Sequence, residues 1–562
     1  MRKLRVLFCI LFFTFSSSFS FGQSWLWARE GINNTNSTVC DPLSITTDNK
    51  GNVFEAGLFQ GSVKFGNDTI TTTGSNTEAF IVKYDSNGNV LWAKSANAAN
   101  LRCVSSSFSV ATDNKGNSYI TGNFIDSINF GAFKIVTKGG DAFLVKYAPN
   151  GNVLWARSSK EISGGVGIEA FSVATDKSCN IYISGRFSDT ISFGSQTTIS
   201  KVYDVFLVKF DSNGNTLWLK SGLTSNSLSS SYTYEVATDN NNNVYLTGSM
   251  LDTVSFGTYR LTTYSPQGSI FLVKYDSNGN VKWAKNSLGI HSFIPFLNYS
   301  YSVVTDKSGC IYITGQFGDS ITFGSYELNT HSPIDIFFVK YDTSGNIIWA
   351  QNGKSLFDGV GYSLSVDKWD HIYLAGSFND SIAFGSVKLI SSSYLPSCIF
   401  VFDTSGKALC GASIDNNNDD ANAIAANPFG HNVYFGGDVE SGQCVFGNDT
   451  LNGGTNEYSF LAKWQPCNNT ITSVNSVTEK NSIAIFPNPN NGVFTIQSSV
   501  AGGPLSVEVY NVLGKKVLTE ALLSPQGNNV INLSDDPSGI YLYRVLNEDG
   551  GLLGSGKVII DK

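Results

Sequence analysis

Histidines and isolated carboxylates are the residues of this chain that could catalyse a reaction or bind a metal, but their spacing favours neither role. The four histidines lie at least 40 residues apart, whereas zinc ligands usually cluster; they are His291, His331, His371 and His431. An enzyme acting on polysaccharides would need non-repeating carboxylates, and three scattered ones qualify: Glu161, Glu169 and Asp358. The sequence shows no Gly-x-Ser-x-Gly elbow and no phosphate loop, while a triad assembled from distant segments stays open. We therefore expect no catalytic residue, no metal ligand and no cofactor.

Other acidic residues recur at fixed intervals, which argues against catalysis because a catalytic carboxylate would be singular. Six aspartates open equivalent turns: Asp48, Asp113, Asp176, Asp239, Asp306 and Asp367. We expect each to cap its own turn. The Asp-Ser-Asn-Gly-Asn turns at 85–89, 211–215 and 276–280 look superficially like calcium loops. They are too short to wrap the ion and lack the distant bidentate glutamate, so we expect no calcium there.

All these residues belong to a repeat of just over 60 residues that runs from Trp27 to about Trp464. A glycine that closes the second strand marks each copy: Gly57, Gly122, Gly185, Gly248, Gly315, Gly376 and Gly437. Each copy reads as four strands. The last two, clearest in Asp141 to Arg157, are joined by an Asn-Gly or Ser-Gly turn that accepts positive φ.

Seven four-stranded units bury their faces by stacking radially, so the sequence predicts an all-β chain with a seven-bladed β-propeller over residues 23–467. Aromatic residues at matching positions, such as Phe143 and Trp155, are expected to fill the space between blades. The last copy lacks a fourth strand, while Leu26-Trp-Ala-Arg29 has no hairpin partner before it. We therefore expect residues 24–29 to supply the outer strand of blade seven, which leaves no open sheet edge.

The links between blades are long and varied, as binding loops tend to be. The longest link, from Asn286 to Ser300, is unusually apolar and holds four candidate binding residues: His291, Phe293, Phe296 and Tyr299. It is either a contact surface for a partner or a segment tucked against its neighbours.

Both ends of the chain carry features of an exported protein. Residues 1–22 read as a signal peptide, with basic residues at the start and an apolar stretch from Val6 to Phe15. No later stretch reaches the length of a membrane-spanning helix. Residues 468–482 read as a polar linker, and residues 483–562 as a small β-sandwich built from short strands.

Eight cysteines follow the signal peptide, and disulfides are allowed in an exported protein. Cys398 and Cys410 take the phenylalanine and tryptophan positions of one hairpin, which predicts a disulfide between them; the alternative is two buried thiols. The net charge is -8 and no basic cluster follows the first residues, so nucleic acid is excluded as a partner.

Two family resemblances extend this interpretation. The recurring Gly-Asn-x-Tyr-x-x-Gly and Asp-x-Phe-Leu-Val-Lys-Tyr patterns resemble the bacterial seven-bladed β-propeller repeat family, whose members are mostly exported proteins of unassigned activity. Residues 485–496, 507–515, 539–545 and 557–560 resemble the type A sorting domain of the type IX secretion system of Bacteroidetes. This resemblance implies an immunoglobulin-like module, engagement with that secretion machinery, and release or attachment of the protein at the outer-membrane surface.

Three functions are compatible with these features. We expect a non-enzymatic protein, secreted or at the cell surface, that binds an extracellular glycan or protein. The alternatives are a polysaccharide-processing enzyme with its active site at the central channel, and a structural component of a surface layer. One further motif, Asp followed by Ser or Thr and an aliphatic residue, resembles a Bacteroidetes O-glycosylation signal, although a repeated turn explains it better (for example Asp126-Ser-Ile).

Overall fold

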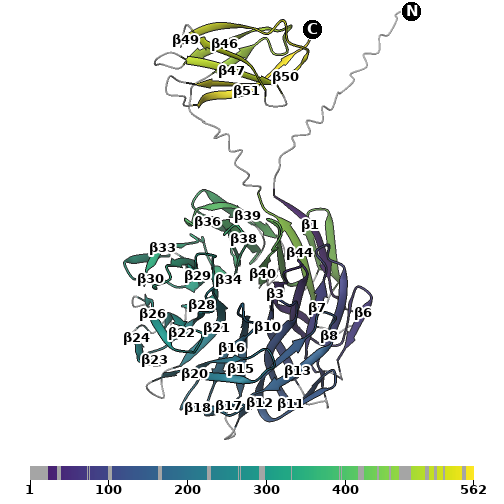
Figure 1. The fold of residues 1–562 in the computed structure, drawn as a ribbon, viewed down its shortest axis with the longest axis vertical. Coiled ribbons are helices and arrows are strands. Elements are labelled where there is room, and N and C mark those ends of the chain that lie inside the picture. Colours follow the sequence, from purple (N-terminus) through teal and green to yellow (C-terminus); the bar gives the residue numbers. More distant parts are fainter. Residues whose placement is uncertain are drawn as a thin grey trace, which may run out of the picture. The chain divides into compact units, whose positions relative to one another are not determined.

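The computed structural model of the 562-residue chain is built from strands, and its described residues contain no helix (Figure 1). The description covers residues 23–33, 39–72, 74, 76–98, 104–161, 167–224, 230–263, 265, 268–289, 298–330, 332–391, 393, 395–414, 423–439, 442–454, 457–467, 483–499, 505–511, 515–522, 526–546 and 552–562. The expected signal peptide and linker lie outside these residues. The chain divides into two compact units, Met1–Asn468 and Asn469–Lys562.

Unit 1 contains seven antiparallel sheets that share one strand order, and we number the sheets first to seventh along the chain. The first sheet is β3 (Cys40–Thr47), β4 (Val53–Phe59), β7 (Glu78–Tyr84) and β8 (Val90–Ser95); the second is β10 (Val104–Thr112), β11 (Ser118–Phe130), β12 (Phe133–Tyr147) and β13 (Val153–Ser158). The third is β15 (Ile168–Thr175), β16 (Ile181–Phe187), β19 (Asp204–Phe210) and β20 (Thr216–Thr224); the fourth is β21 (Ser231–Thr238), β22 (Val244–Met250), β25 (Ser269–Tyr275) and β26 (Val281–Asn286). The fifth is β28 (Tyr299–Thr305), β29 (Ile311–Phe317), β32 (Asp335–Tyr341) and β33 (Ile347–Asn352); the sixth is β34 (Gly359–Val366), β35 (Ile372–Phe378), β38 (Ser397–Phe402) and β39 (Ala408–Ile414). The seventh is β40 (Ala423–Ala426), β41 (Val433–Val439), β44 (Tyr458–Gln465) and β1 (Ser24–Glu30).

Short strands between the second and third strands of every sheet but the second form outlying hairpins, and in the second sheet β11 and β12 themselves continue into this hairpin. Some of the hairpins are extended by a strand from a link between sheets. The short strands are β2 (Ile32–Asn33), β5 (Ser62–Phe65), β6 (Asp68–Thr71), β9 (Asn97–Ala98), β14 (Lys160–Glu161), β17 (Thr190–Phe193), β18 (Gln196–Ile199), β23 (Thr253–Phe256), β24 (Tyr259–Thr262), β27 (Leu288–Gly289), β30 (Ser320–Phe323), β31 (Tyr326–Asn329), β36 (Ser381–Phe384), β37 (Val387–Ile390), β42 (Gly442–Phe446) and β43 (Asp449–Gly454). The hairpin β23–β24 joins the third sheet through β20.

The first strands of the seven sheets follow one another in a cycle around the centre of unit 1 (Figure 1). The contacts run β3–β10, β10–β15, β15–β21, β21–β28, β28–β34, β34–β40 and back from β40 to β3. Buried clusters fill the space between neighbouring sheets; one combines Phe54, Ile81 and Trp92 of the first sheet with Val110 and Phe143 of the second.

The outer strand of the seventh sheet comes from the other end of the unit. Strand β1 pairs antiparallel with β44, with Trp25 opposite Trp464 and Ala28 opposite Ala462. This is the pairing that the sequence predicts for residues 24–29. Because β44 would otherwise be an edge strand, β1 pairs the row of backbone hydrogen-bonding groups that β44 would leave exposed, and β1 becomes the outer strand of the sheet.

A β-bulge in the first strand explains the glycine that marks the repeat. In the second sheet the register shifts between Ser107 and Ser109, so Phe108 has no partner of its own on β11. The bulge pushes the carbonyl of Ser106 towards Gly122, where a Cβ would lie only 1.8 Å from that oxygen. Only glycine fits such a close approach. The same shift occurs in the first to sixth sheets.

Replacing Gly122 by alanine should therefore destabilise unit 1, by about 2 kcal/mol, because backbone atoms must move to admit the methyl group. Urea unfolding followed by tryptophan fluorescence measures this loss. The matched control is Gly385→Ala, at a glycine with nothing within 4 Å of the added Cβ but with a positive φ of 57°. If Gly122→Ala costs no more than the control, the bulge does not require the glycine.

Lysine and tryptophan side chains join each of the first five sheets to the turn between the third and fourth strands of the next. Lys83 Nζ and Trp92 Nε1 of the first sheet both donate to the carbonyl of Pro149 in the second, at 3.3 and 3.1 Å. The next four sheets repeat this arrangement with acceptors Ser212, Ser277, Thr343 and Thr404. At the point of closure Lys463 donates to Ser86 and Trp27 packs beside Gly88.

The sixth sheet lacks these lysine and tryptophan hydrogen bonds to the next sheet. The predicted disulfide between Cys398 and Cys410, which both lie in the sixth sheet, is wrong. Val401 and Cys410 take the places of the lysine and the tryptophan. Cys410 bonds to Cys467, with a Cα–Cα distance of 6.3 Å, and Cys398 is a buried free thiol. In the strand register Cys398 lies opposite Ser413, three residues beyond Cys410. A shift of three residues puts the two cysteines on opposite faces and too far apart to bond.

The physical reason for the observed disulfide is the missing turn in the seventh sheet. Since β1 supplies the fourth strand, the turn that accepts hydrogen bonds in the other sheets has no counterpart after β44 among the described residues. Cys467 stands two residues after β44, where that turn begins in the other sheets. The disulfide therefore joins the sixth sheet to the seventh, as the lysine and tryptophan hydrogen bonds join neighbouring sheets elsewhere.

Unit 2 has two antiparallel sheets around one core. One sheet is β45 (Ile483–Phe486), β46 (Val493–Ser499) and β49 (Gln526–Asn532); the other is β48 (Lys516–Leu522), β47 (Leu505–Asn511), β50 (Gly539–Leu546) and β51 (Leu552–Ile560). Phe494 and Ile531 of the first sheet are buried in the same cluster as Val507, Val545 and Val558 of the second.

Candidate functional site: the central channel

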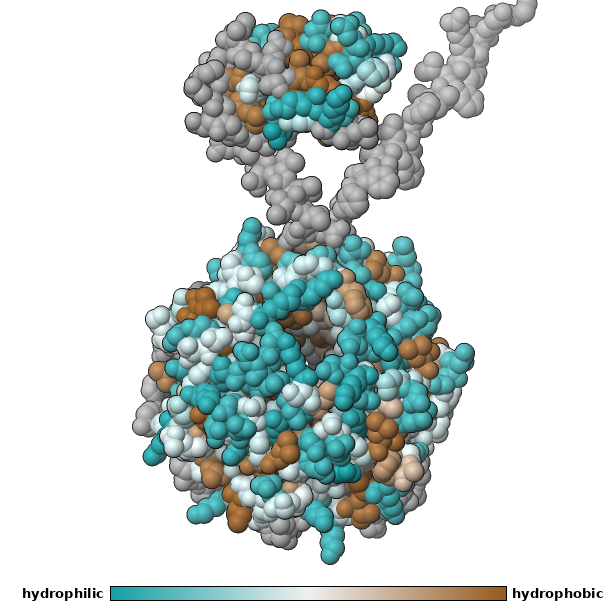
Figure 2. All heavy atoms as spheres, in the orientation of Figure 1, coloured by the Kyte–Doolittle hydropathy of each residue, from teal (hydrophilic) through white to brown (hydrophobic). Residues whose placement is uncertain are grey.

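The first strands of all seven sheets line a cavity of about 420 Å³ on the axis of unit 1. In the view of Figure 2, the surface of unit 1 is hollowed near its centre. The volume falls in the usual range of small-ligand pockets.

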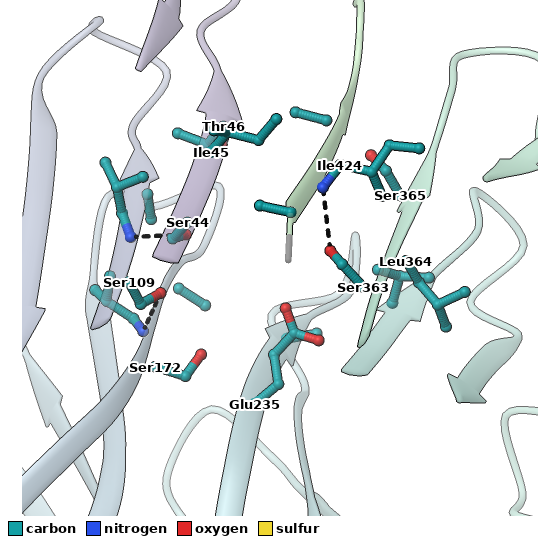
Figure 3. A pocket seen from close by; sticks show the side chains of 18 of the residues that line it. Ser44, Ile45, Thr46, Ser109, Ser172, Glu235, Ser363, Leu364, Ser365 and Ile424 are labelled. Carbon is teal, nitrogen blue, oxygen red and sulfur yellow. Dashed lines mark hydrogen bonds between the residues drawn. The ribbon is translucent and has the colours of Figure 1, made fainter. Parts of the chain in front are cut away.

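Serine side chains from five of the seven sheets form an incomplete ring around the axis; the fourth sheet has an acid in its place, and the seventh has Ala423 at the equivalent register. Each of five serine side chains accepts a hydrogen bond from a backbone N–H of the next sheet: Ser44, Ser109, Ser172, Ser302 and Ser363. In the fourth sheet the same position is Glu235, whose Oε2 accepts from Val303 N at 2.5 Å. Figure 3 shows Glu235 pointing into the open space between the strands. Sequence analysis missed this residue, although aligning the repeats on their glycines exposes it as the one acid among serines.

Burial raises the pKa of Glu235 to about 7, and hydrogen bonds from Ser302 and from the Val303 N–H lower it by less. At neutral pH the carboxyl group is therefore shared between a neutral form that donates a hydrogen bond and a charged form that only accepts. Such a group can hold a hydroxyl-bearing ligand or move a proton.

Next to the ring of serines lies a row of aromatic side chains, which we call the aromatic arc. Its members are the bulged residues of five successive first strands: Phe108, Phe171, Tyr234, Tyr301 and Tyr362. Successive ring centroids lie between 5.0 and 6.4 Å apart. All five border the cavity and are half-buried. The bulge turns these side chains towards the axis, which the regular two-residue alternation of a strand does not predict.

Arg186 extends the arc on one side. Its guanidinium lies over the rings of Tyr232, Tyr203 and Phe171, with 4.8 Å between its carbon and the Tyr232 centroid. It is held by an ion pair with Glu169. Arg186 therefore adds one hydrogen-bond donor close to the arc, and the rings that it covers add further aromatic faces.

The candidate binding residues from the long link are only partly covered by the structure. His291, Phe293 and Phe296 lie outside the described residues. Tyr299 begins β28, where its ring contacts Tyr234 and Tyr301 with centroids 6.0 and 5.9 Å apart. It therefore supports the aromatic arc from behind and borders a small apolar hollow with Met250 and Leu251.

Of the three scattered carboxylates, Glu169 and Asp358 do not line the channel. Glu169 pairs with Arg186, and Asp358 lies in the link before β34, half-buried and not on the cavity wall. Glu161 is in β14, and its side chain lies outside the described residues.

The recurring aspartates cap their turns, as their spacing predicts. Asp113 Oδ1 accepts from the N–H groups of Lys115 and Asn117, and its Oδ2 accepts from Tyr119 and from the Asn117 side chain. The Asp-Ser/Thr motif also has a structural role, since Asp126, like its counterparts in the third to sixth sheets, adopts a positive φ, between 60° and 70°.

Two of the four histidines come together, against the expectation of isolated residues. His371 Nδ1 lies 2.9 Å and His431 Nδ1 3.7 Å from Asp367 Oδ2. The two histidines are 60 residues apart because they stand at nearly equivalent positions of neighbouring sheets, which the repeat period could have revealed.

Unit 2 matches a known family. Residues 484–561 match the model of the secretion system C-terminal sorting domain. That match identifies the tail as a signal for the type IX secretion system, so the protein is secreted or displayed at the outer-membrane surface. In the described part of the chain, no helix has the length and apolar character needed to cross a membrane.

Similarity to individual proteins is distant. An uncharacterized WD repeat-containing protein L264 of Acanthamoeba polyphaga mimivirus is 23% identical over an alignment of 427 residues that covers 60% of this chain. The match spans 29% of that relative's length. A solved structure of unknown function from Dyadobacter fermentans covers 79% of this chain and 99% of its own, at 9% identity and TM-score 0.36. PorZ of Porphyromonas gingivalis, described as a surface component of the type IX secretion system, covers 95% of this chain and 100% of its own at 10% identity and TM-score 0.20.

Proposed function

We propose that unit 1 is a seven-bladed β-propeller delivered to the cell surface, where it binds a carbohydrate without transforming it. The cyclic contacts of the first strands and the closure by β1 support the propeller. The two-sheet core of unit 2 supports an immunoglobulin-like sorting module on the same chain.

The aromatic arc beside the 420 Å³ cavity is the observation on which the binding function rests. Aromatic rings offer flat apolar faces together with the polar tips of tyrosines. A sugar ring has the complementary surface, with C–H groups on its faces and hydroxyls on its edge. The serine ring and Glu235 lie one residue further along each strand, within reach of those hydroxyls.

The charges of the channel favour a neutral sugar over an acidic one. Glu235 is the one carboxylate among the described residues of the cavity wall, and no lysine or arginine lines it. A sulfated or uronic ligand would therefore meet an acid on the wall, and the nearby Arg186 is already paired with Glu169. The protein's net charge of -8 also disfavours a negatively charged ligand.

A polysaccharide-processing enzyme is the second candidate, because a buried carboxyl with a pKa of about 7 suits a general base. Hydrolysis of a glycosidic bond normally requires a second carboxylate about 5–10 Å away. None of the described wall residues supplies one. Glu235 therefore fits a ligand-binding role better than a hydrolytic one.

A glycan array probed with the fluorescently labelled full-length chain tests both candidates. We expect retention on neutral oligosaccharides, and we expect chromatography of the same oligosaccharides after overnight incubation to show no product. Product formation would support the enzyme instead. Failure to bind any glycan, together with capture of a surface protein, would contradict carbohydrate binding.

A further inference from the structure

We propose that Asp367, His371 and His431 form a binding site for a divalent transition metal, Zn²⁺ in the exported protein, which ties the sixth sheet to the seventh. The three ligand atoms lie within 4.8 Å of one another. A single ion placed between them can reach one carboxylate oxygen and two imidazole nitrogens, which is a common set of protein ligands for zinc.

The recurring turn aspartate is kept at this site, but the residues that face it depart from the repeat. In the first, second, third and fifth sheets the turn aspartate faces a lysine, as Asp306 faces Lys340 at 3.8 Å. In the sixth sheet that lysine is Val401, which leaves Asp367 without its cation. An asparagine also closes the turn in the first four sheets, and His371 replaces it here. The lost positive charge and the two gained imidazoles are what a metal site requires.

Hydrogen bonds already hold the Asp367 carboxylate in an orientation that suits a metal ion. Asp367 Oδ1 accepts from the N–H groups of Trp369 and His371, at 2.8 and 2.9 Å, and Oδ2 accepts from Tyr373 at 3.0 Å. Its side chain has no exposed surface, whereas the side chains of His371 and His431 are 23% and 40% exposed. Hydrogen bonds of this kind fix metal-binding carboxylates, and the exposed side leaves room for water as a further ligand.

His431 is held in place by its own neighbours. Its ring stacks on Trp369, with centroids 3.8 Å apart and planes inclined by 19°. Its backbone carbonyl accepts from Tyr373, which also bonds Asp367. The seventh-sheet histidine is therefore presented to the sixth-sheet carboxylate. On binding, the ion takes the place of the proton between His371 Nδ1 and Asp367 Oδ2, and the neutral ring then carries its one proton on Nε2.

The location gives the ion a structural purpose. This junction lacks the lysine and tryptophan that join the other sheets, and it is where the chain departs towards unit 2. Imidazole nitrogen favours zinc, nickel and copper over magnesium or calcium. The metal site is thus a second link between the sixth and seventh sheets, in addition to the Cys410–Cys467 disulfide.

Isothermal titration of the full-length chain, without a polyhistidine tag, with ZnCl₂ tests the proposal. We expect one equivalent bound with micromolar or tighter affinity, and at least tenfold weaker binding by His371→Asn and by His431→Asn. His371→Asn restores the residue of the first four sheets, so the turn keeps its hydrogen bonds and the variant should fold. His331→Asn serves as the control that removes a histidine outside the three.

Cobalt(II) provides an independent readout, because its visible absorption reports the ligands directly. We expect a band with Co²⁺ in the wild type and in His331→Asn, and its loss in the two site variants. Absence of zinc binding, or binding that both site variants retain, would overturn the proposal and leave His371 as a turn-closing residue only. Neither outcome bears on glycan binding at the channel.

Discussion

Replacing Cys410 and Cys467 by serine is expected to lower the free energy of unfolding of unit 1 by about 4 kcal/mol. The cysteines close a loop of 57 residues, so their bond restricts the unfolded chain strongly. They also join the two sheets at the junction without lysine and tryptophan contacts. Urea unfolding followed by fluorescence measures this loss for unit 1 alone, because all nine tryptophans lie between residues 25 and 464.

A reductant supplies the control for this prediction. With the disulfide reduced, the wild type should unfold at nearly the same urea concentration as Cys410→Ser/Cys467→Ser. Cys398→Ser should keep the disulfide and its dependence on reductant, whatever it costs in packing. Equal stability of oxidised and reduced wild type would show that this bond does not hold the junction.

The second large effect is expected at Glu55, which is fully buried where the other sheets carry an apolar residue such as Ile120 or Leu246. Its Oε2 accepts from Tyr84 at 2.5 Å. Burial raises the pKa of Glu55 from 4.5 to about 7, and the hydrogen bond from Tyr84 lowers it by less. Glu55→Gln keeps an acceptor for Tyr84 and removes the charge. We expect it to stabilise unit 1 at pH 8 and to have little effect at pH 5.

The sign of this pH dependence follows from proton uptake. Between pH 4.5 and pH 7 the folded protein holds a proton on Glu55 that the unfolded chain has lost. The stabilising contribution of the protonated form is therefore complete below pH 4.5 and is lost as the pH rises to 7. The gain of the variant over the wild type should grow by roughly 2–3 kcal/mol from pH 5 to pH 8.

Urea unfolding at the two pH values measures that growth. The control is Glu327→Gln, an exposed acid of β31, whose effect should not change with pH over this range. A gain for Glu55→Gln that is equal at both pH values would mean that Glu55 titrates normally in the folded protein.

The strand order and the pairing of residues 24–29 were predictable because both leave a local signal. Each turn carries Asp or Gly at a fixed place, and the repeat has one strand too few at its end and one too many at its start. The C-terminal sorting domain was likewise recognisable from its motifs, and its family model matches residues 484–561.

The channel residues were not predictable from strand alternation. A bulge shifts the register by one residue at Phe108 and its counterparts, so side chains that alternation places on the sheet face turn to the axis. The glycine opposite the bulge is the sequence signal, although by itself it indicates only the end of a strand.

The Cys410–Cys467 disulfide and the proximity of His371 to His431 were not predictable, for a different reason. Cys410 finds its partner beyond β44, where the described residues contain no such turn because β1 completes the sheet. His371 and His431 meet only because neighbouring sheets pack side by side. Both contacts depend on the order of sheets around the cycle and not on distance along the chain.

The decisive measurement is isothermal titration of a neutral oligosaccharide that the array retains into the wild type and into Tyr234→Ala/Tyr301→Ala. The two tyrosines form the middle of the aromatic arc, with ring centroids 5.0 Å apart. Tyr326→Ala, at an outlying hairpin away from the cavity wall, is the matched control. We predict that the double variant, still folded by circular dichroism, loses at least tenfold in affinity while the control keeps it. Equal affinity of all three proteins would contradict carbohydrate binding at the channel.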